Sequence, residues 1–482
     1  MESIVMYPSP AIGHMISMVE LAKLILKHKP SVFIHIIIFD LPYNDGSTAT
    51  YIDKVSATIS SIIFHHLPTV TLPPSITSST RHHEELTFEV LRVNNPNLHQ
   101  ALLSISKSYT VSAFILDCFC TTALSVTAKL NIPSFGFFTS GAGALAVLLY
   151  LPTIHKTITK NLKDIDTIIH IPGVPPIPSK GMPKPVLERE NKAYQFFMDT
   201  SMKLSKSAGI IVNTFEKLES RSIKAMNDGL CVLDGSTPPI YSIGPLTTAD
   251  DPSGGNGVDD NHDRPECLKW LDSQPPQSVV FLCFGSLGVF SEEQLKEIAI
   301  GLEKSGQRFI WVVRNPPSKN KMMAIPEQLD LDLDLILPEG FLDRTKERGL
   351  VLKSWAPQVK ILNHDSVGGF VTHCGWNSVL EAVLAGVPMV AWPLYAEQKL
   401  NSVFMVEEMK IALPVKEFEN GLVSSTEVEK RVRELMESEE GKCLRKQTMA
   451  MKNEGKAALN EGGSSLLALS NLFKSCNLQR EF

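Results

Sequence analysis

The stretch 368-GGFVTHCGWNSVLEAVLAGVPMVAWP-393 predicts a strand, a loop, a helix and a second strand in immediate succession. Both strand segments are almost wholly apolar, whereas a strand with one solvated face would alternate polar and apolar residues. Such strands are typical of a parallel sheet that helices cover on both faces. Residues 373–378 then place a histidine, a thiol, a glycine and an indole at the sheet edge, just before a helix that begins near Asn377. The stretch therefore predicts an α/β fold with polar groups gathered at one edge of its sheet.

The same alternation of buried strands and helices runs through the rest of the chain. Near the N-terminus, a strand, a Pro/Gly turn over 8–14, an apolar helix over 15–28 and a second strand form a βαβ unit. The pattern restarts at residue 278 with another apolar strand segment. In the helix that follows, Ser291 and Gln294 form a predicted capping box at the start, and Gly306 is expected to mark the end. The other apolar segments predicted as strands are 32–39, 112–117, 132–138, 209–215, 278–286 and 308–313.

A polar stretch separates the two halves. Residues 247–266 are rich in Gly, Asp and Asn and nearly free of large apolar side chains, so they cannot join a core and are predicted to be a linker. We expect an N-terminal Rossmann-like domain over 1–246, a C-terminal one over 267–460, and a C-terminal helix over 461–482 that packs back on the N-terminal domain. Overlapping capping boxes at Ser424–Glu427 and Thr426–Glu429 predict the helices near the end.

Charge and cysteine usage exclude several classes of function. A formal net charge of −6 without a long Lys/Arg run provides no attraction for nucleic acid or anionic lipid. The chain opens without a signal peptide, and its most apolar later stretch, 143–152, is too short to span a membrane, so we expect a cytoplasmic protein. The eight cysteines include no CxxC pair, and the histidine pairs 65–66 and 82–83 lack HExxH spacing, so no metal site is expected.

A nucleotide-binding motif appears at 141-GAGALA-146, which satisfies GxGxxA. The acidic residue expected about 20 positions later should end a second apolar strand. Here Asp164 and Asp166 lie in a polar segment instead. We interpret the motif as small-residue helix packing, and keep an NAD-dependent oxidoreductase only as an alternative.

The loop at 373–378 is a better ligand site. In open parallel sheets, ligands bind beyond the carboxyl ends of the strands, where helix N-termini present free N–H groups and partial positive charge. The amides and side chains of Asn377 and Ser378 suit a diphosphate, Gly375 permits close approach of the backbone, and Glu381 on the same helix face suits the two hydroxyls of a ribose. The alternative is an ordinary helix start, with Trp376 as a core residue.

Flanking segments extend this pattern. Upstream, 354-SWAPQ-358 supplies Trp355 as a flat face for a base and Gln358 as a polar partner. Downstream, 393-PLYAEQ-398 places Glu397 and Gln398 after a strand end, where they suit the hydroxyls of a sugar. Base, ribose, diphosphate and sugar are then all provided for.

Residues 355–398 resemble the 44-residue signature segment of plant secondary-product UDP-glycosyltransferases, from "WAPQ" through "HCGWNS" to "EQ". Other stretches resemble the same family, and most of all its members that act on flavonoids, chalcones and related phenolics: "YPSPAIGH", "FILDCFCTTA", "FFTSGA", "VNTFEKLE", "SIGPL" and "FGS". Two positions depart from the common pattern, with Ser17 where many members have Pro and Glu397 where many have Asp. The resemblance implies a GT-B fold, in which two Rossmann-like domains face each other, the C-terminal one holding a UDP-sugar and the N-terminal one the acceptor.

The resemblance also implies roles for individual residues. Trp355, in the "WAPQ" motif with Ala356, would stack on uracil, and Gln358 and Glu381 would bind ribose. A Trp at the first position and a Gln at the last, Gln398, imply a preference for UDP-glucose. The diphosphate would be held by Ser286, His373, Asn377 and Ser378, with Gly375 beside them, and the sugar would face Thr139, Trp376, Glu397 and Gln398.

His14 and Asp117 are the predicted catalytic pair. His14 lies in the first strand–helix turn and Asp117 closes a buried strand, so both stand at the carboxyl edge of the N-terminal sheet. His14 would remove the acceptor proton and Asp117 would hold its tautomer and stabilise the imidazolium, as the family assigns. The alternatives from the residues alone are a solvated histidine and a helix-capping aspartate.

We therefore expect an inverting, single-displacement transfer of glucose from UDP-glucose to a phenolic hydroxyl, by a monomer that needs no metal. Transfer to carbon and a non-catalytic nucleotide-sugar-binding protein remain the alternatives. Aromatic side chains from the N-terminal half are predicted to wall the acceptor pocket: Phe119, Phe137, Phe138, Tyr150, Phe196 and Phe197.

Overall fold

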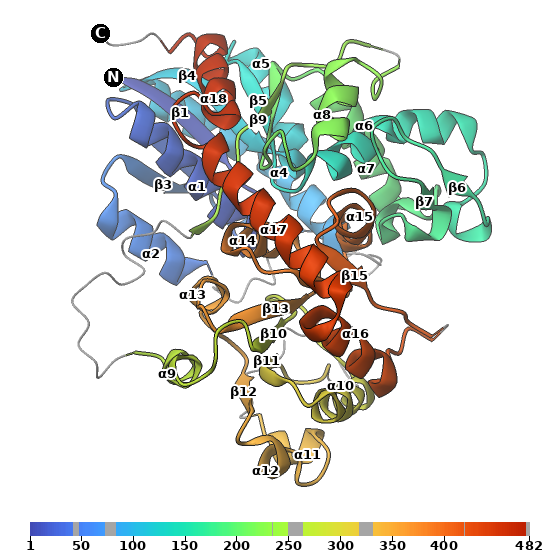
Figure 1. The fold of residues 1–482 in the computed structure, drawn as a ribbon. Helices are drawn as coiled ribbons and strands as arrows, with labels where there is room; N and C mark the ends of the chain where they lie inside the picture. The colour runs from blue at the N-terminus through green and yellow to red at the C-terminus, as the bar shows by residue number, and fades with distance from the viewer. Residues whose placement is uncertain are drawn as a thin grey trace. The chain divides into compact units, whose positions relative to one another are not determined.

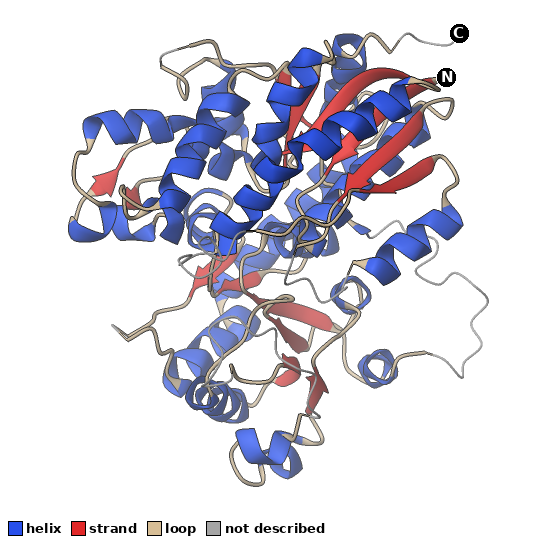
Figure 2. Ribbon diagram, turned by 180° about the vertical axis from the view of Figure 1, so that it is seen from behind, coloured by secondary structure: helices blue, strands red, loops and turns tan. Residues whose placement is uncertain are grey.

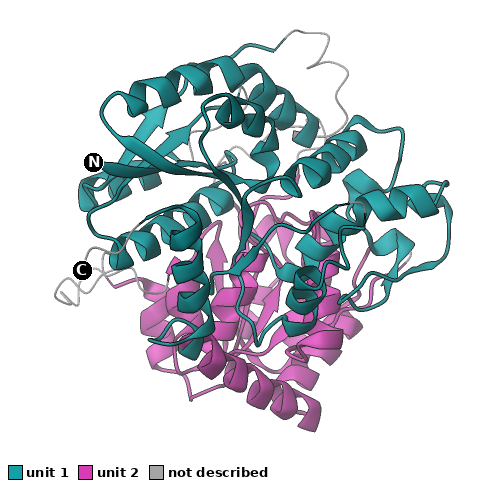
Figure 3. Cartoon of the chain, turned by 90° about the horizontal axis from the view of Figure 1, so that it is seen from above, with its two compact units in different colours: residues 1–246, 457–482 teal, residues 247–456 magenta. Residues whose placement is uncertain are grey.

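The computed structural model describes residues 1–41, 48–72, 83–233, 235–248, 264–317, 331–418 and 420–478. The chain divides into two compact units, residues 1–246 with 457–482 and residues 247–456 (Figure 3). Most of the predicted linker, residues 249–263, lies outside the described residues. The second unit ends at Lys456, slightly before the end at residue 460 expected from the sequence.

The first unit is built on a seven-stranded sheet whose strands are all parallel (Figure 1). The chain moves from β1 outward through β2 to β3, and then returns to the other side of β1 to continue through β4, β5, β8 and β9. The direction of winding therefore reverses between β1 and β4. In spatial order the strands are β3 (Ile62–His66), β2 (Phe33–Ile38), β1 (Glu2–Tyr7), β4 (Thr110–Asp117), β5 (Ser134–Phe138), β8 (Gly209–Val212) and β9 (Ile240–Ser242).

Alternate side chains of this sheet enter two different cores. Ile4 and Met6 of β1 join the core on one face, and Val5 and Tyr7 join the core on the other. Both faces are thus buried, which is why these strands are apolar without alternation. The helices and 3-10 turns of this unit are α1 (Ile12–His28), α2 (Ala49–Thr58), α4 (His83–Ser106), η1 (Cys118–Ala123), α5 (Leu124–Lys129), α6 (Ala142–Thr157), η2 (Leu162–Asp164), η3 (Ser179–Gly181), η4 (Lys184–Val186), α7 (Lys192–Leu204), α8 (Ser220–Asn227) and α18 (Ser464–Ser475).

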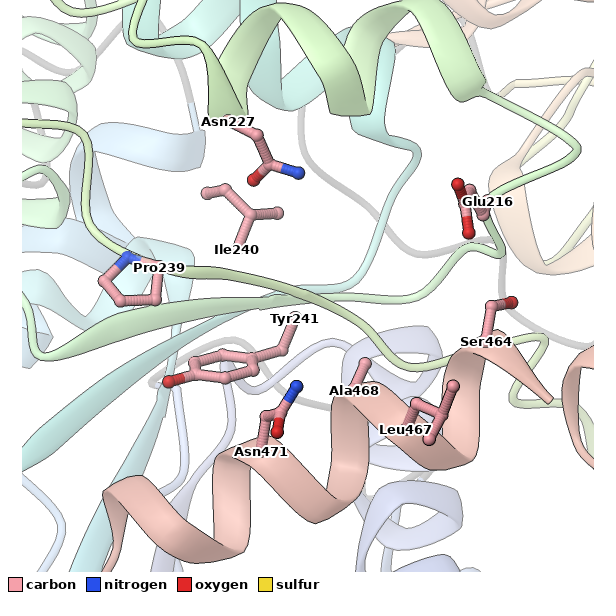
Figure 4. Close-up of a pocket in the computed structure, with 9 residues that line it drawn as sticks. All are labelled: Glu216, Asn227, Pro239, Ile240, Tyr241, Ser464, Leu467, Ala468 and Asn471. Atoms are coloured by element: carbon pink, nitrogen blue, oxygen red, sulfur yellow. The ribbon is translucent and has the colours of Figure 1, made fainter. Parts of the chain in front are cut away.

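The C-terminal helix α18 packs on the first unit. Leu469, Leu472 and Phe473 join the core that contains β1 and α1, and the hydroxyls of Tyr241 and Ser475 lie 2.7 Å apart. A shallow hollow runs beside α18 and the edge strand β9, and the residues predicted for function do not line it (Figure 4). A two-stranded antiparallel ribbon, β6 (Ile168–Ile169) with β7 (Ile177–Pro178), completes the unit.

The second unit repeats the architecture with a six-stranded parallel sheet, whose winding reverses between β10 and β13. In spatial order the strands are β12 (Gly349–Lys353), β11 (Arg308–Val313), β10 (Val279–Cys283), β13 (Val367–Thr372), β14 (Met389–Ala391) and β15 (Ala412–Pro414). Figure 2 shows the strands and helices of both units by colour. The helices are α9 (Glu266–Asp272), α10 (Glu292–Ser305), α11 (Leu333–Ile336), α12 (Phe341–Thr345), α13 (Gln358–Leu362), α14 (Trp376–Ala385), α15 (Gln398–Val403), the π-helical turn η7 (Phe404–Glu408), α16 (Ser425–Glu437) and α17 (Glu439–Ala458).

The predicted helix ends are partly right. Ser291 caps α10 by accepting from the Gln294 N–H, and Gly306 ends that helix with φ of +69°. The reciprocal half of the capping box is wrong, because the Gln294 side chain bonds the backbone of Val423 instead. Of the two overlapping boxes near the C-terminus, Ser424 provides the cap of α16.

Within the described residues, no helix combines the length and the apolar character needed to cross a membrane. All eight cysteines are free, and only Cys443 is exposed. Among those same residues, no group of three or more His, Cys, Asp or Glu side chains is placed to hold a metal ion. His65 contacts His35, with 2.8 Å between Nε2 and Nδ1, while His82 and the side chain of His83 lie outside the described residues.

Candidate functional site

The point where each sheet reverses its winding is where the predicted site residues gather. In the first unit, Asp117 is the last residue of β4, and His14 lies in the first turn of α1, which follows the neighbouring strand β1. Thr139 follows β5 directly, on the other side of β4. A reversal of strand order opens a crevice at the carboxyl ends of the strands, because the helices of the two neighbouring connections cover opposite faces.

His14 and Asp117 are hydrogen-bonded. The Nδ1 atom of His14 lies 2.7 Å from Oδ2 of Asp117, whose side chain is fully buried, while that of His14 is 25% exposed. The hydroxyl of Thr139 is 3.2 Å from the same Nδ1. Since the carboxylate accepts from Nδ1–H, the neutral imidazole presents an unprotonated Nε2, which is the form that can accept a proton.

Asp117 makes both of the contacts that the sequence left as alternatives, one to His14 and one to the backbone of the following turn. While Oδ2 bonds His14, Oδ1 accepts from the N–H of Phe119 at 3.0 Å and so caps the η1 turn. One carboxylate therefore fixes the loop after β4 and the ring of His14 together. The sequence could not show this double role, because it depends on the register between β1 and β4.

Three of the six predicted aromatic residues form one cluster next to His14. The ring of Phe119 lies 5.6 Å from the His14 ring and 5.7 Å from that of Phe197. Phe88 of α4, which the sequence analysis missed, stacks on Phe196 at 4.7 Å and contacts the edges of Phe119 and Phe197. The only sign of Phe88 in the sequence is its position on the apolar face of a helix. Ordinary core residues occupy such positions as well, so the position does not indicate a binding site.

The other three aromatic residues are placed differently. Phe137 has no exposed surface and belongs to the core between the sheet and α1, so it cannot wall a pocket, and that prediction is corrected. Phe138 is 7% exposed at the end of β5, and Tyr150 is half-buried on α6. These two residues are not part of the cluster around Phe88.

The first turn of α6, within the GxGxxA motif, is occupied from inside the protein. The buried carboxylate of Glu219 accepts from the N–H groups of Ala142 and Gly143 at 2.8 and 2.9 Å. A pyrophosphate bound at this motif would need the same two amides as donors. Because Glu219 already accepts from them, they are not available to a bound phosphate. Glu219 also ties the segment after β8 to the loop that carries Thr139.

In the second unit, the residues predicted to hold the diphosphate surround the N-terminus of α14. Gly375 is the N-cap, and Trp376, Asn377 and Ser378 are the first three helical residues, whose N–H groups have no acceptor within the helix. The indole of Trp376 is only 4% exposed, so its backbone amide is the part that lies at the helix end. Ser286 is exposed in the loop after β10, the strand that neighbours β13.

His373 is buried between two glycines. A Cβ atom on either Gly285 or Gly375 would lie 2.5 Å from Nε2 of His373, so both positions must lack a side chain. Burial lowers the pKa of His373 to about 4, which keeps the ring neutral. Its buried Nδ1 has no hydrogen-bond partner among the described residues, and such an atom is expected to bind a ligand or water. Gly285, which the sequence analysis did not select, also has φ of +76°.

The groups predicted for base and ribose lie beside this helix end. Nε2 of Gln358 donates to Oε2 of Glu381 at 2.6 Å and to the hydroxyl of Ser378 at 2.8 Å. Burial raises the pKa of Glu381 to about 7, and the Gln358 hydrogen bond only partly offsets this. Trp355 is 70% exposed, which suits a ring that stacks on a ligand, whereas the neighbouring Ala356 is 9% exposed.

The side chain of Gln398 has a divided role. Its Oε1 accepts from the backbone N–H groups of Leu394 and Tyr395 at 2.8 and 2.9 Å. Since both partners are donors, the atom that faces them must be oxygen, which leaves the Nε2 amide as the group for a sugar hydroxyl. Glu397 is half-buried next to it.

Backbone strain clusters in this segment. Ser354, Cys374 and Ala396 have φ of +64°, +65° and +52°, a region that residues with a side chain rarely adopt. Each of these residues directly precedes a predicted ligand-binding residue or the N-cap of α14. Strained backbone that the surrounding structure maintains is typical of binding sites.

These geometries can be compared with known proteins. The family described as "UDP-glucoronosyl and UDP-glucosyl transferase" matches residues 248–452. An anthocyanidin 5,3-O-glucosyltransferase from a Rosa hybrid cultivar is 52% identical over 485 residues, which cover 98% of each chain.

The chain belongs to this family of UDP-glycosyltransferases.

A phloretin 2'-O-glucosyltransferase from Malus domestica is 48% identical over 98% of this UDP-glycosyltransferase and 99% of the relative. The solved structure of Phytolacca americana UGT2, complexed with UDP-2fluoro-glucose and pterostilbene, superposes with a TM-score of 0.86 at 36% identity, covering 99% of this chain and 100% of that one. The GT-B fold predicted from the sequence is thereby confirmed. So is the prediction of an enzyme that transfers sugar from a UDP-sugar.

Proposed function

We propose that this UDP-glycosyltransferase transfers glucose from UDP-glucose to a hydroxyl of a flavonoid-type or related phenolic molecule, with inversion at the anomeric carbon. The names of the relatives support the acceptor class, since anthocyanidin, phloretin and pterostilbene are all phenols with aromatic rings. The cluster of Phe88, Phe119, Phe196 and Phe197 beside His14 suits such an acceptor.

The observation that carries the proposal is the 2.7 Å hydrogen bond between His14 and Asp117 at the carboxyl edge of the first sheet. In the proposed reaction, Nε2 of His14 takes the proton of the phenol while the phenol oxygen attacks the anomeric carbon. The imidazolium that results is stabilised by the buried carboxylate of Asp117. The bond between the anomeric carbon and the diphosphate oxygen breaks at the same time, and UDP leaves.

The charge of the departing UDP is stabilised by the second unit in this proposal. The first-turn amides of α14, the side chains of Asn377 and Ser378, and a proton on Nδ1 of His373 would face the diphosphate. Trp355 would stack on the uracil and Glu381 would accept from the ribose hydroxyls. We propose that these groups suffice without a divalent cation.

Glucose is the proposed sugar because Trp355 and Gln398 occupy the first and last positions of the 355–398 segment. Glu397 and Gln398 would bond the sugar hydroxyls, with Gln398 as a donor. Thr139 lies at hydrogen-bond distance from His14, so its hydroxyl would be at the reacting end of the sugar. We further propose that the enzyme acts as a cytoplasmic monomer.

Incubation with UDP-glucose and a panel of flavonoids, chalcones and simple phenols tests the proposal, with the products analysed by mass and by the position of the new bond. An O-glucoside of a flavonoid-type phenol is expected, in the presence of EDTA as well as without it. A carbon-linked product would instead favour C-transfer to a similar phenol. The base is tested by His14→Ala in the same assay, where activity near the wild-type level would refute the assigned role.

A further inference from the structure

A side chain outside the predicted site connects two of its loops. Asn401, in α15, is 1% exposed, and its Nδ2 amide donates to the carbonyl oxygen of Cys374 at 2.9 Å. The same Nδ2 lies 3.4 Å from Oε1 of Glu397. One buried amide therefore contacts the turn after β13 and the side chain that follows β14.

The turn that Asn401 holds is strained. Cys374 has φ of +65° and is fully buried, and its N–H bonds the hydroxyl of Thr372 at 3.3 Å. A left-handed conformation is unfavourable for a residue with a side chain and needs neighbours that maintain it. Because the peptide is planar and trans, fixing the carbonyl of Cys374 also fixes the opposite direction of the N–H of Gly375, the N-cap of α14.

The chemistry of the contact selects an amide at position 401. The Cys374 carbonyl and the Glu397 carboxylate are both acceptors, so only a group with two N–H donors bonds both. Aspartate would have the same shape but would present an oxygen to two other oxygens. Leucine would fill the space without bonding either, leaving a buried carbonyl without its partner.

We propose that Asn401 is a positioning residue that sets the diphosphate-binding turn at 373–376 and the sugar-facing carboxylate of Glu397 in one step. The inference deepens the proposed function and rests on its placement of the UDP-sugar along residues 355–398. It makes two separable statements. The contact with Cys374 should affect the binding of UDP itself, and the contact with Glu397 should affect which sugar is accepted.

The test compares Asn401→Leu and Asn401→Asp with wild type by calorimetric titration of UDP and by the kinetics of UDP-glucose and UDP-galactose. Losing one buried hydrogen bond to the turn should raise the Kd of UDP about tenfold. The KM for UDP-glucose should rise by more than kcat falls, and the preference for UDP-glucose over UDP-galactose should narrow. Should neither variant fold, Asn401→Ser, which keeps one donor, takes their place in the same comparison.

Gln294→Leu is the matched control. Gln294 is also a buried amide of the second unit, 5% exposed, and bonds the backbone of Val423 in both directions at 2.8 Å. Its replacement should lower the melting temperature as much as the Asn401 variants do, while leaving the Kd of UDP unchanged. If the Asn401 variants bind UDP no more weakly than Gln294→Leu does, Asn401 is merely structural and the inference is overturned.

A further variant separates this inference from the proposed donor site. Trp355→Ala removes the exposed ring proposed to stack on uracil, so it should weaken UDP binding. If UDP binds Trp355→Ala as tightly as wild type, the placement of the donor site fails. If Trp355→Ala binds weakly and the Asn401 variants bind normally, only the role of Asn401 is refuted.

Discussion

Asp117→Asn is the substitution that most directly tests how the first unit prepares His14. The two oxygens of Asp117 have different partners, with Oδ1 on the N–H of Phe119 and Oδ2 on Nδ1 of His14. In asparagine, the amide oxygen can keep the cap on Phe119, and its NH₂ group then faces Nδ1. A donor at that place makes Nδ1 the acceptor and moves the ring proton to Nε2. The variant should therefore fold normally but hold the wrong tautomer of His14.

The expected loss follows from the proposed mechanism. General-base catalysis raises a reaction rate by about 10²- to 10⁴-fold. The hydrogen bond from the imidazolium to a fully buried carboxylate joins two charged groups, and such bonds are stronger than those between neutral groups. We expect kcat to fall about 10³-fold, or roughly 4 kcal/mol in activation free energy. The Kd of UDP should not change, and the melting temperature should fall only slightly because the cap persists.

The assay is steady-state turnover at saturating UDP-glucose, with two phenolic acceptors of different acidity. An acceptor that is largely phenolate at the assay pH needs no base, so it should lose less activity in Asp117→Asn than a weakly acidic one. Asp272→Asn is the control, since Asp272 accepts from Nε2 of His364 at 3.1 Å in the second unit, and kcat should stay at the wild-type level. A kcat for Asp117→Asn within a few-fold of wild type would refute the reasoning about the tautomer.

Three further outcomes are expected. Glu219→Gln should lower the free energy of unfolding by about 2–4 kcal/mol, because one backbone N–H at the start of α6 would then face an NH₂ group. Denaturant titrations measure this change, and a loss below about 1 kcal/mol would contradict the prediction. The affinity for UDP should rise as pH increases from 6 to 8, because burial raises the pKa of Glu381 to about 7 and its ionised form is the better acceptor for ribose hydroxyls; calorimetry on Glu381→Gln should show a flatter profile, and an equally steep one would oppose the assignment. Burial and the nearby His65 lower the pKa of His35 to about 4, so on acidification this histidine is protonated at a higher pH in the unfolded chain than in the folded one. The free energy of unfolding should therefore fall by at most about 3 kcal/mol as pH drops from about 6.5 to about 4. His35→Leu should remove that part of the pH dependence in thermal unfolding, and an unchanged slope would count against it.

Much of the site could be predicted from local sequence because its parts are local. A helix that follows a buried parallel strand begins at the carboxyl edge of the sheet, so Asn377 and Ser378 could be placed there from the pattern around residue 375. The same reasoning placed His14 and Asp117 at one edge, and the hydrogen bond between them is observed. The 355–398 segment was enough to predict the family, because its "WAPQ", "HCGWNS" and "EQ" motifs lie close together along the chain.

The tertiary structure decided which alternatives hold where a side chain has two possible partners. Asp117 both caps a turn and bonds His14, Gln294 bonds the backbone of Val423 in the loop before α16 instead of its own helix end, and Phe137 lies in the core instead of beside the cluster around Phe119. These outcomes depend on strand register and on which helix covers which face, and neither is encoded within a short window of sequence.

The sequence by itself determined the α/β class, the helix N-termini and the signature segment, since each follows from periodicity or from groups close together in the chain. Only the folded chain brought together Asn401 with Cys374, Glu219 with the start of α6, and Phe88 with the aromatic cluster. Cys374 and Asn401 are 27 positions apart and Ala142 and Glu219 are 77 apart, so no local pattern links them. The physical reason is that a backbone pattern specifies which face of an element is buried, whereas packing of whole elements decides which side chain that face meets.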